Sequence, residues 1–286
     1  MCRKRPREET PLTTLIFDID DTLYDVGSGF TAHRNGDAVF EFMQAKLKFE
    51  SAEAAKLVRD VYFEKYHATV KALTVAEAEG RLPAGAHFDP ADLAEWWSTR
   101  LAFSKFLSVD AAFVHSLQRC PLRLVAFTNA PRRYGVRVLE TLGLRGLFPD
   151  VNLFAVEDVM PYPKPHRKAF QKVLASLGAD ADECCLVEDS MKNIRGAKAV
   201  GMRTVLVRGR PASDPELKAA SEATKPGDRP DASDPAVDAV VDEVRELETT
   251  LPGLWRPGSD GRLVFGTTSA RRFDSDRALG TEREAL

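Results

Sequence analysis

The 286-residue chain is predicted to form a doubly wound α/β fold, in which helices cover both faces of a parallel sheet. Three observations predict it. Short apolar runs alternate with helix-like segments over residues 122–207. Glycines follow the helical segments at intervals, as expected because the residue that ends a helix often has a left-handed backbone conformation, which favours glycine. A further strand-like run at 13–17 lies about a hundred residues before the others, which predicts a large insert after the first strand.

The first strand and the insert are predicted from their contrasting periodicities. Residues 13–17 (TTLIF) are β-branched and aromatic, which is typical of a buried strand. The following hundred residues or so repeat apolar side chains at helical spacing, for example Trp96 and Trp97 after a helix start at Pro90. The insert is therefore predicted to be a helical cap without strands of its own.

The remaining elements alternate strand and helix, which predicts right-handed crossovers and a parallel sheet. Strands are predicted at 122–127, 151–156, 184–187 and 203–207, helices at 136–142, 165–177 and 194–200, and a last edge strand and helix within 236–255. The predicted domains are an α/β core at 12–22 and 121–255 and a helical cap at 23–120, with flexible segments at 1–11, 211–235 and 257–286.

Composition is typical of a globular protein, with 44 % apolar and 29 % charged residues. The net charge of −3 argues against a nucleic-acid polymer or a membrane surface as partner, and no apolar run reaches the roughly 18 residues of a membrane span. The four cysteines lack metal-ligand spacing and are interpreted as reduced, so a cytoplasmic location is expected. The basic run RKRPR at 3–7 leaves nuclear import open as an alternative.

Polar residues follow three of the predicted strands at their carboxyl ends, the edge where open α/β sheets bind ligands. They are Asp18 and Asp20 after the first strand, Thr128 and Asn129 after the second, and Glu188 and Asp189 after the strand at 184–187. Each pair alone is compatible with a turn or a helix cap. Carboxylates converging from separate strands without matching arginines favour a hard cation, and oxygen ligands suit Mg²⁺ rather than Zn²⁺.

Lys164 lies between two prolines in the segment YPKPH, which fixes the direction of its backbone. A lysine so placed can bind a phosphate oxygen and offset the charge of a neighbouring aspartate. A surface lysine in a proline-rich loop is the alternative.

The segments DIDDT, TNA, PKP and VEDSMKN, in this order with a helical insert between the first two, resemble the four motifs of the haloacid dehalogenase (HAD) superfamily of phosphohydrolases. The resemblance covers roughly residues 12–255. Within the superfamily, FDIDDTLY and the cap stretch VYFEKYHATVKAL (61–73) are similar to the pyrimidine 5′-nucleotidase branch. That branch usually has glycine where this chain has His67, a departure that bears on base specificity rather than on the chemistry.

The resemblance implies a role for each motif residue. Asp18 is expected to be the nucleophile, already ionised and forming an aspartyl-phosphate, and Asp20 the general acid and base, with its pKa raised by adjacent anionic charge. Mg²⁺ is the expected cofactor. Its implied ligands are Asp18, Asp189 and the backbone carbonyl of Asp20, while Thr128, Asn129 and Lys164 hold phosphoryl oxygens, Glu188 assists the metal, and Asn193 orients Asp189.

The foremost functional expectation is a Mg²⁺-dependent pyrimidine 5′-nucleotidase that releases phosphate from UMP or CMP. A phosphosugar phosphatase or mutase of the same superfamily is the first alternative, since only the cap separates them, and a non-catalytic interaction protein is the second. In each enzymatic case the partner is a small phosphorylated metabolite. Tyr24 and Tyr66 are candidates for stacking on a nucleoside, with core packing as the alternative, and Asp21 and Asp25 are assigned to the turn.

Overall fold

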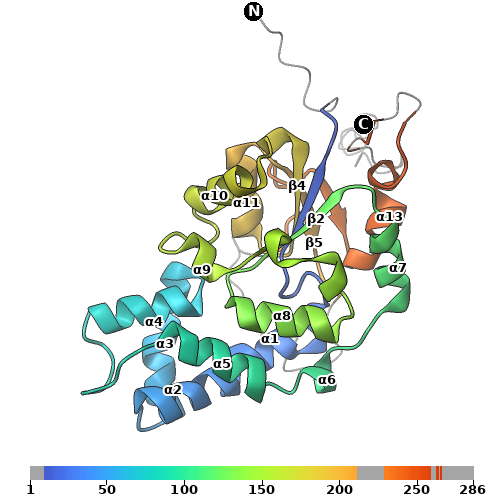
Figure 1. The fold of residues 1–286 in the computed structure, drawn as a ribbon. Coiled ribbons are helices and arrows are strands. Elements are labelled where there is room, and N and C mark those ends of the chain that lie inside the picture. The colour runs from blue at the N-terminus through green and yellow to red at the C-terminus, as the bar shows by residue number, and fades with distance from the viewer. Residues whose placement is uncertain (1–9, 211–228, 259–261, 264, 266–286) are drawn as a thin grey trace, which may run out of the picture.

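The computed structural model describes residues 10–210, 229–258, 262–263 and 265. Within them, six parallel strands form one sheet in the order β3-β2-β1-β4-β5-β6 (Figure 1). The strands are β1 (Thr14–Phe17), β2 (Arg123–Phe127), β3 (Leu153–Phe154), β4 (Cys184–Glu188), β5 (Arg203–Val207) and β6 (Ala239–Val241). The predicted α/β fold with a parallel sheet is therefore confirmed, and the first strand of the chain occupies the centre of the sheet.

The chain between β1 and β2 is helical, as predicted (Figure 1). Its elements are η2 (Val26–Ser28), α1 (Phe30–His33), the π-helical turn η3 (Arg34–Ala38), α2 (Val39–Leu47), α3 (Ala52–Tyr66), α4 (Thr69–Ala78), α5 (Pro90–Arg100), α6 (Phe103–Phe106) and α7 (Ala111–Arg119). Ser51 and Asp89 cap the amino ends of α3 and α5 with their side chains. These caps explain where the two longest helices of the insert begin.

Helix α7 is hydrogen-bonded to the end of the core sequence. The backbone carbonyl of Ser116 accepts a hydrogen bond from Trp255 Nε1 at 2.9 Å. The hydroxyl of the same serine donates to Glu248 Oε2 at 2.7 Å. The cap boundary at 23–120 stays a prediction, and these bonds attach its last helix to the core.

The two faces of the sheet carry separate hydrophobic clusters, as the alternation of side chains along a strand requires. Leu15 and Phe17 of β1 belong to the larger cluster with helix α8 (Arg132–Thr141) and helix α7. Ile16 faces the opposite side, with α10 (Arg167–Leu177) and α11 (Met191–Val200). The neighbours Cys184 and Cys185 divide between the same two clusters as free thiols, so their predicted opposite orientation is confirmed.

The strand predicted at 151–156 is shorter than expected. Only Leu153–Phe154 pair with β2, between the 3₁₀ turn η5 (Asp150–Asn152) and helix α9 (Val156–Val159). The carboxylate of Asp158 accepts the backbone N–H of Ala155 at 2.7 Å, which starts the helix directly after the strand. The end of the core adds η8 (Val244–Glu246), α13 (Leu247–Thr250) and η9 (Pro252–Leu254).

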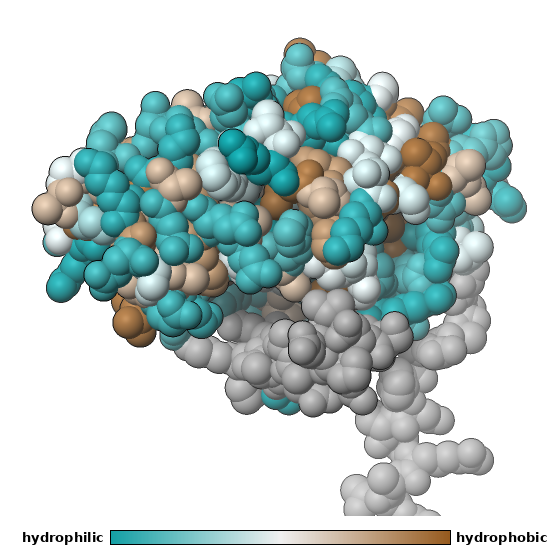
Figure 2. Space-filling model, turned by 90° about the horizontal axis from the view of Figure 1, so that it is seen from below, coloured by the Kyte–Doolittle hydropathy of each residue, from teal (hydrophilic) through white to brown (hydrophobic). Residues whose placement is uncertain are grey.

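Figure 2 shows hydrophilic residues over much of one face of the described surface, with small scattered apolar areas. No helix among the described residues is long and apolar enough to cross a membrane. Of the segments predicted to be flexible, residues 1–9, 211–228, 259–261, 264 and 266–286 lie outside the described residues, as does the basic run at 3–7. In the described part of 211–235, Asp231 accepts the backbone N–H of Ser233 in a local turn.

Candidate active site

The carboxyl edge of the sheet brings together residues far apart in the sequence. Phe17, the last residue of β1, is in register with Ala126 of β2 and Val187 of β4. The residues that follow these three positions therefore meet at one edge. This edge joins Asp18, Thr128 and Glu188, together with Asp20, Asn129 and Asp189 next to them.

Lys164 is buried at the centre of this group, with 1 % of its surface exposed, so the alternative of a surface lysine is wrong. Its ammonium donates to Asp18 Oδ1 at 2.7 Å, to Glu188 Oε2 at 2.9 Å and to the carbonyl of Phe127 at 2.8 Å. These contacts use all three N–H donors of an ammonium. Burial acts to lower the pKa of Lys164, but the two carboxylates outweigh it and the pKa lies above its ordinary value.

Asn129 builds the loop that holds Lys164. Its Oδ1 accepts the backbone N–H of Lys164 at 2.9 Å, and its Nδ2 donates to the Lys164 carbonyl at 2.8 Å. The same Nδ2 lies 3.3 Å from the carbonyl of His67, at the end of cap helix α3. The side chain of Asn129 thus links the lysine loop to the cap, a role that the sequence did not indicate. Its backbone N–H, predicted to bind a phosphoryl oxygen, donates to no acceptor within the described chain.

Three carboxylates converge beside Lys164. Ligand oxygens of Asp18, Glu188 and Asp189 lie within 4.8 Å of one another. Burial, followed by the charge of Glu188, raises the pKa of Asp18 to about 8, and the same two causes raise the pKa of Asp189 well above its ordinary value. One ammonium faces three carboxylates, so the group lacks positive charge. A small oxygen-lined group of this kind fits a hard divalent cation such as Mg²⁺.

The raised pKa of Asp18 differs from the expectation that it is already ionised. That expectation used the pKa of a carboxylate in water, whereas Asp18 is buried beside another carboxylate. A divalent cation among the three carboxylates would favour their ionised forms.

The predicted pairing of Asn193 with Asp189 is wrong. Asn193 Nδ2 donates instead to Glu188 Oε2 at 3.0 Å. Glu188 is fully buried and also accepts the backbone N–H of Ser190 at 3.2 Å. Asp189 is held by Thr22, whose hydroxyl donates to Oδ1 at 3.2 Å. Glu188 is therefore the more firmly positioned of the two acidic residues after β4.

Asp20 faces a different set of partners. Its Oδ1 accepts from the hydroxyls of Tyr24 at 2.7 Å and Tyr134 at 2.6 Å, and its Oδ2 accepts from Arg34 Nη1 at 2.6 Å. Burial acts to raise the pKa of Asp20, but Arg34 and the hydroxyls outweigh it and hold the pKa below its ordinary value. The predicted rise is therefore wrong, because the cap supplies a cation that the motif itself does not contain.

Arg34 is a residue of this site that sequence reasoning missed. It comes from η3 in the cap, and its guanidinium lies 5.1 Å from the ring of Trp97 and 4.8 Å from the ring of Tyr134. Tyr134 belongs to core helix α8, so Arg34 is held between cap and core. No motif marks Arg34, and its position depends on how the insert folds back onto the sheet.

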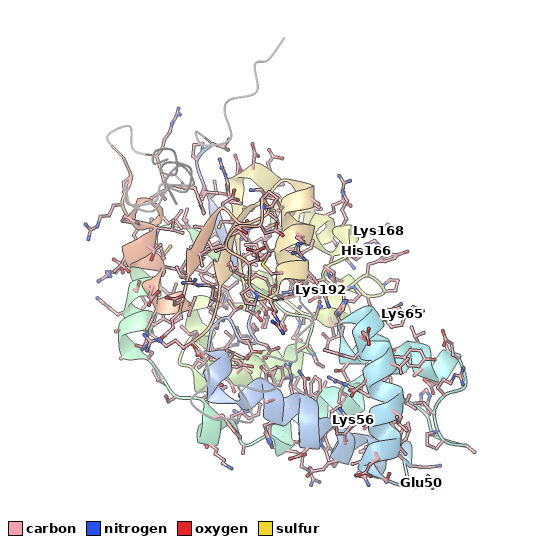
Figure 3. The ribbon with its side chains drawn as sticks, turned by 180° about the vertical axis from the view of Figure 1, so that it is seen from behind. Glu50, Lys56, Lys65, His166, Lys168 and Lys192 are labelled. Atoms are coloured by element: carbon pink, nitrogen blue, oxygen red, sulfur yellow. The ribbon has the colours of Figure 1, made fainter. Side chains whose placement is uncertain are left out.

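The two tyrosines considered for stacking differ in their positions. Tyr24 is buried and bonded to Asp20, so the alternative of packing describes it better than stacking on a nucleoside. Tyr66 is half-buried and stacks on Tyr62, with ring centroids 6.4 Å apart. Figure 3 shows Lys65 on the cap side and Lys192 on the core side of the boundary between cap and core.

The turn residues of the first motif keep their predicted structural roles. Asp25 accepts the backbone N–H of Gly27 at 2.6 Å and begins η2. Asp21 has a left-handed backbone with φ of 58°, and burial, followed by the charge of Asp20, raises its pKa to about 7. Thr128 is fully buried, and its Oγ1 accepts the backbone N–H of Ala130 at 3.0 Å, which leaves its hydroxyl hydrogen available to a ligand.

Comparison with known proteins places these features in a family. The haloacid dehalogenase-like hydrolase model matches residues 12–201, and a HAD-hydrolase-like model matches residues 161–247. The chain is 26 % identical over 202 residues to the glyceraldehyde 3-phosphate phosphatase of Methanothermobacter thermautotrophicus, covering 68 % of this chain and 85 % of that protein. It is 26 % identical over 248 residues to the ribulose-1,5-bisphosphate 5-phosphatase of Halopiger xanaduensis, covering 82 % and 97 %.

A solved structure supports the fold. CbbY from Rhodobacter sphaeroides in complex with phosphate matches with a TM-score of 0.52 at 17 % identity, covering 82 % of this chain and 96 % of that one. The two curated relatives are named as phosphatases of phosphorylated sugars, and the pyrimidine 5′-nucleotidase prediction finds no support in them.

Proposed function

Because the chain belongs to the haloacid dehalogenase-like hydrolases, we propose that it is a Mg²⁺-dependent phosphatase of small phosphorylated sugars or acids. The observation that carries this proposal is the position of Asp18, buried between the ammonium of Lys164 and the carboxylates of Glu188 and Asp189. A carboxylate so placed can act as a nucleophile without a separate base once it is ionised.

The residues that would hold Mg²⁺ are Asp18, Asp189 and the backbone carbonyl of Asp20, with Glu188 in the same carboxylate group. The cation supplies positive charge that lets a phosphate dianion approach this acidic edge. Lys164 supports the approach through its charge, since its three donors are engaged by Asp18, Glu188 and Phe127. The hydroxyl of Thr128 and the backbone N–H of Asn129 are the groups proposed to bind phosphoryl oxygens.

In the first half of the reaction, an oxygen of Asp18 attacks phosphorus, and the bond from phosphorus to the leaving oxygen breaks. Asp20 donates a proton to that oxygen, which leaves as an alcohol. This step needs protonated Asp20, so Arg34 must exchange its partner when substrate binds. In the second half, water attacks the phosphorus of the aspartyl-phosphate, and the bond from phosphorus to the Asp18 oxygen breaks, which releases phosphate and free Asp18. Asp20, ionised after its first proton transfer, accepts a proton from the attacking water.

Phosphate release from a panel of substrates tests the proposal. The panel contains glyceraldehyde 3-phosphate, 2-phosphoglycolate and ribulose 1,5-bisphosphate, with UMP and CMP for the nucleotidase alternative. We expect Mg²⁺-dependent release, abolished by EDTA, from at least one sugar or acid phosphate at a higher kcat/KM than from either nucleotide. The reverse order would favour the nucleotidase, and no release from any compound would favour the non-catalytic interaction protein.

A further inference from the structure

The cap contains a group of buried hydrogen-bond donors without acceptors. Four side-chain nitrogens are buried and have no hydrogen-bond partner within the described residues: Nε of Arg34, Nε and Nη2 of Arg59, and Nε1 of Trp97. We call these three residues the cap donor group. They come from η3, α3 and α5, so three separate segments of the insert contribute to it.

The burial of Arg59 makes the missing acceptors costly. Its side chain is 8 % exposed, and its one ion pair among the described residues joins Nη1 to Asp60 at 3.1 Å, where the aspartate side chain is 39 % exposed. Its guanidinium also lies 3.9 Å from the ring centroid of Phe63, a contact that satisfies no N–H donor. Burial and the nearby charge of Arg34 lower the pKa of Arg59. Buried donors without partners destabilise a fold, and a buried charge does so more strongly. A residue kept in this state is better explained by a ligand than by stability.

One member of the cap donor group, Arg34, contacts Asp20 directly. Arg34 joins the group to the site, since its guanidinium lies 5.1 Å from the ring of Trp97 and its Nη1 binds Asp20. Asp20 is two residues from Asp18, a span of at most about 7 Å along the chain. A phosphorylated molecule bound at Asp18 would therefore extend its other end toward these donors.

We propose that the cap donor group binds a second anionic group of the substrate, either a carboxylate or a second phosphate. This inference rests on the proposed phosphatase function and narrows its substrate class. Guanidinium groups bind both anions through paired N–H donors, and the indole of Trp97 adds another. The amide of Asn35, whose Oδ1 is also buried without a partner, can present its Nδ2 instead by rotating.

Matched substrate pairs test this inference. In one pair, 2-phosphoglycolate is compared with 2-hydroxyethyl phosphate, which lacks the carboxylate. In the other, ribulose 1,5-bisphosphate is compared with ribulose 5-phosphate, which lacks the second phosphate. We expect the wild-type kcat/KM to favour the anionic member of one pair by about tenfold or more, as charge-assisted hydrogen bonds allow. The pair that responds identifies the anion as carboxylate or phosphate.

Variants of Arg59 assign the preference to the cap donor group. Arg59→Met should reduce the ratio of the two kcat/KM values about tenfold, and Arg59→Lys by less, because a charge remains. Arg100→Met, an exposed arginine of α5 in the same cap, is the control and should leave the ratio unchanged.

Three outcomes separate the two proposals. The inference is overturned if Arg59→Met leaves the ratio of the two kcat/KM values unchanged. It is also overturned if the wild-type protein hydrolyses the neutral members as well as the anionic ones, although the proposed phosphatase function then stands. If no member of either pair releases phosphate with Mg²⁺, the proposed function itself fails.

Discussion

Arg34 of the cap and Asp20 of the core form an ion pair, with Nη1 and Oδ2 2.6 Å apart and both side chains largely buried. The pair crosses the boundary between the helical insert and the sheet edge. The protonation of Asp20 therefore depends on where the cap holds Arg34. This contact makes the cap part of the proposed chemistry as well as of substrate selection.

The first prediction concerns the nucleophile. Asp18→Asn should reduce phosphate release at least about a thousandfold, because an amide cannot form the aspartyl-phosphate. The change conserves side-chain volume, so Tm should shift little. Asp25→Asn, in the same acidic stretch but in the turn, is the matched control and should retain activity. Turnover by Asp18→Asn comparable to that of the wild type would remove Asp18 as nucleophile.

The second prediction concerns Lys164. Lys164→Met leaves Asp18 and Glu188 without their shared buried cation, which should lower the free energy of unfolding by about 3–5 kcal/mol. Urea unfolding measures this change, and the inhibition constants for phosphate and vanadate should rise. Lys168→Met, at an exposed position four residues away, should leave both quantities near the wild-type values. Unchanged inhibition by vanadate would separate Lys164 from phosphate binding.

The third prediction concerns the hydroxyls that hold Asp20. Tyr134→Phe removes one donor to Oδ1 and leaves that of Tyr24, so Asp20 is less firmly oriented. A hydrogen bond to a charged group contributes enough that kcat should fall about tenfold. Tyr162→Phe, at an exposed tyrosine outside this network, is the comparison and should have no effect. Equal kcat values for both variants would show that Tyr134 contributes only packing.

The fourth prediction concerns the stability of the metal-free protein. The pKa of Asp18 is about 8 and that of Asp21 is about 7, both above the ordinary value of 3.8. Between about pH 4 and pH 8 the folded state then binds more protons than the unfolded state, so stability falls as pH rises. In EDTA, Tm should therefore be lower at pH 8 than at pH 5.

Adding Mg²⁺ should reverse most of this loss at pH 8 and have a smaller effect at pH 5, where the carboxylates are protonated and bind a cation poorly. Differential scanning calorimetry at pH 5 and pH 8 measures the shift in Tm on adding Mg²⁺, with Ca²⁺ as a comparison cation. A metal-free Tm that is equal at both pH values would contradict the raised pKa values. A Tm at pH 8 that Mg²⁺ leaves unchanged would contradict the proposed cation site.

The sheet edge was predictable because its signals are local. An apolar run followed by Asp18 marks a strand end without knowledge of the rest of the fold, and the same is true of Thr128 and Glu188. Parallel topology then places such ends together. Lys164 was found for a similar reason, since its flanking prolines mark a rigid loop.

The partners of these residues were less predictable, because they depend on side-chain directions and on the packing of the insert. Asn193 is one helical turn from Asp189, yet it bonds to Glu188, whose side chain turns inward to Lys164. Arg34 is remote from every motif and reaches Asp20 only through the path of the cap helices. In the proposed function the cap selects the substrate as well. The motifs alone therefore could not decide between a nucleotidase and a phosphatase of sugars or acids.

The central position of β1 has a consequence for how the protein forms. Thr14 is synthesised long before its partners Arg123 and Cys184, which follow much later in the chain. While the insert is being synthesised, neither β2 nor β4 exists yet. The apolar strand β1 therefore stays without its sheet partners during this time. Such long-range pairing is typical of slow folding, and truncated translation products should aggregate rather than assemble a partial sheet.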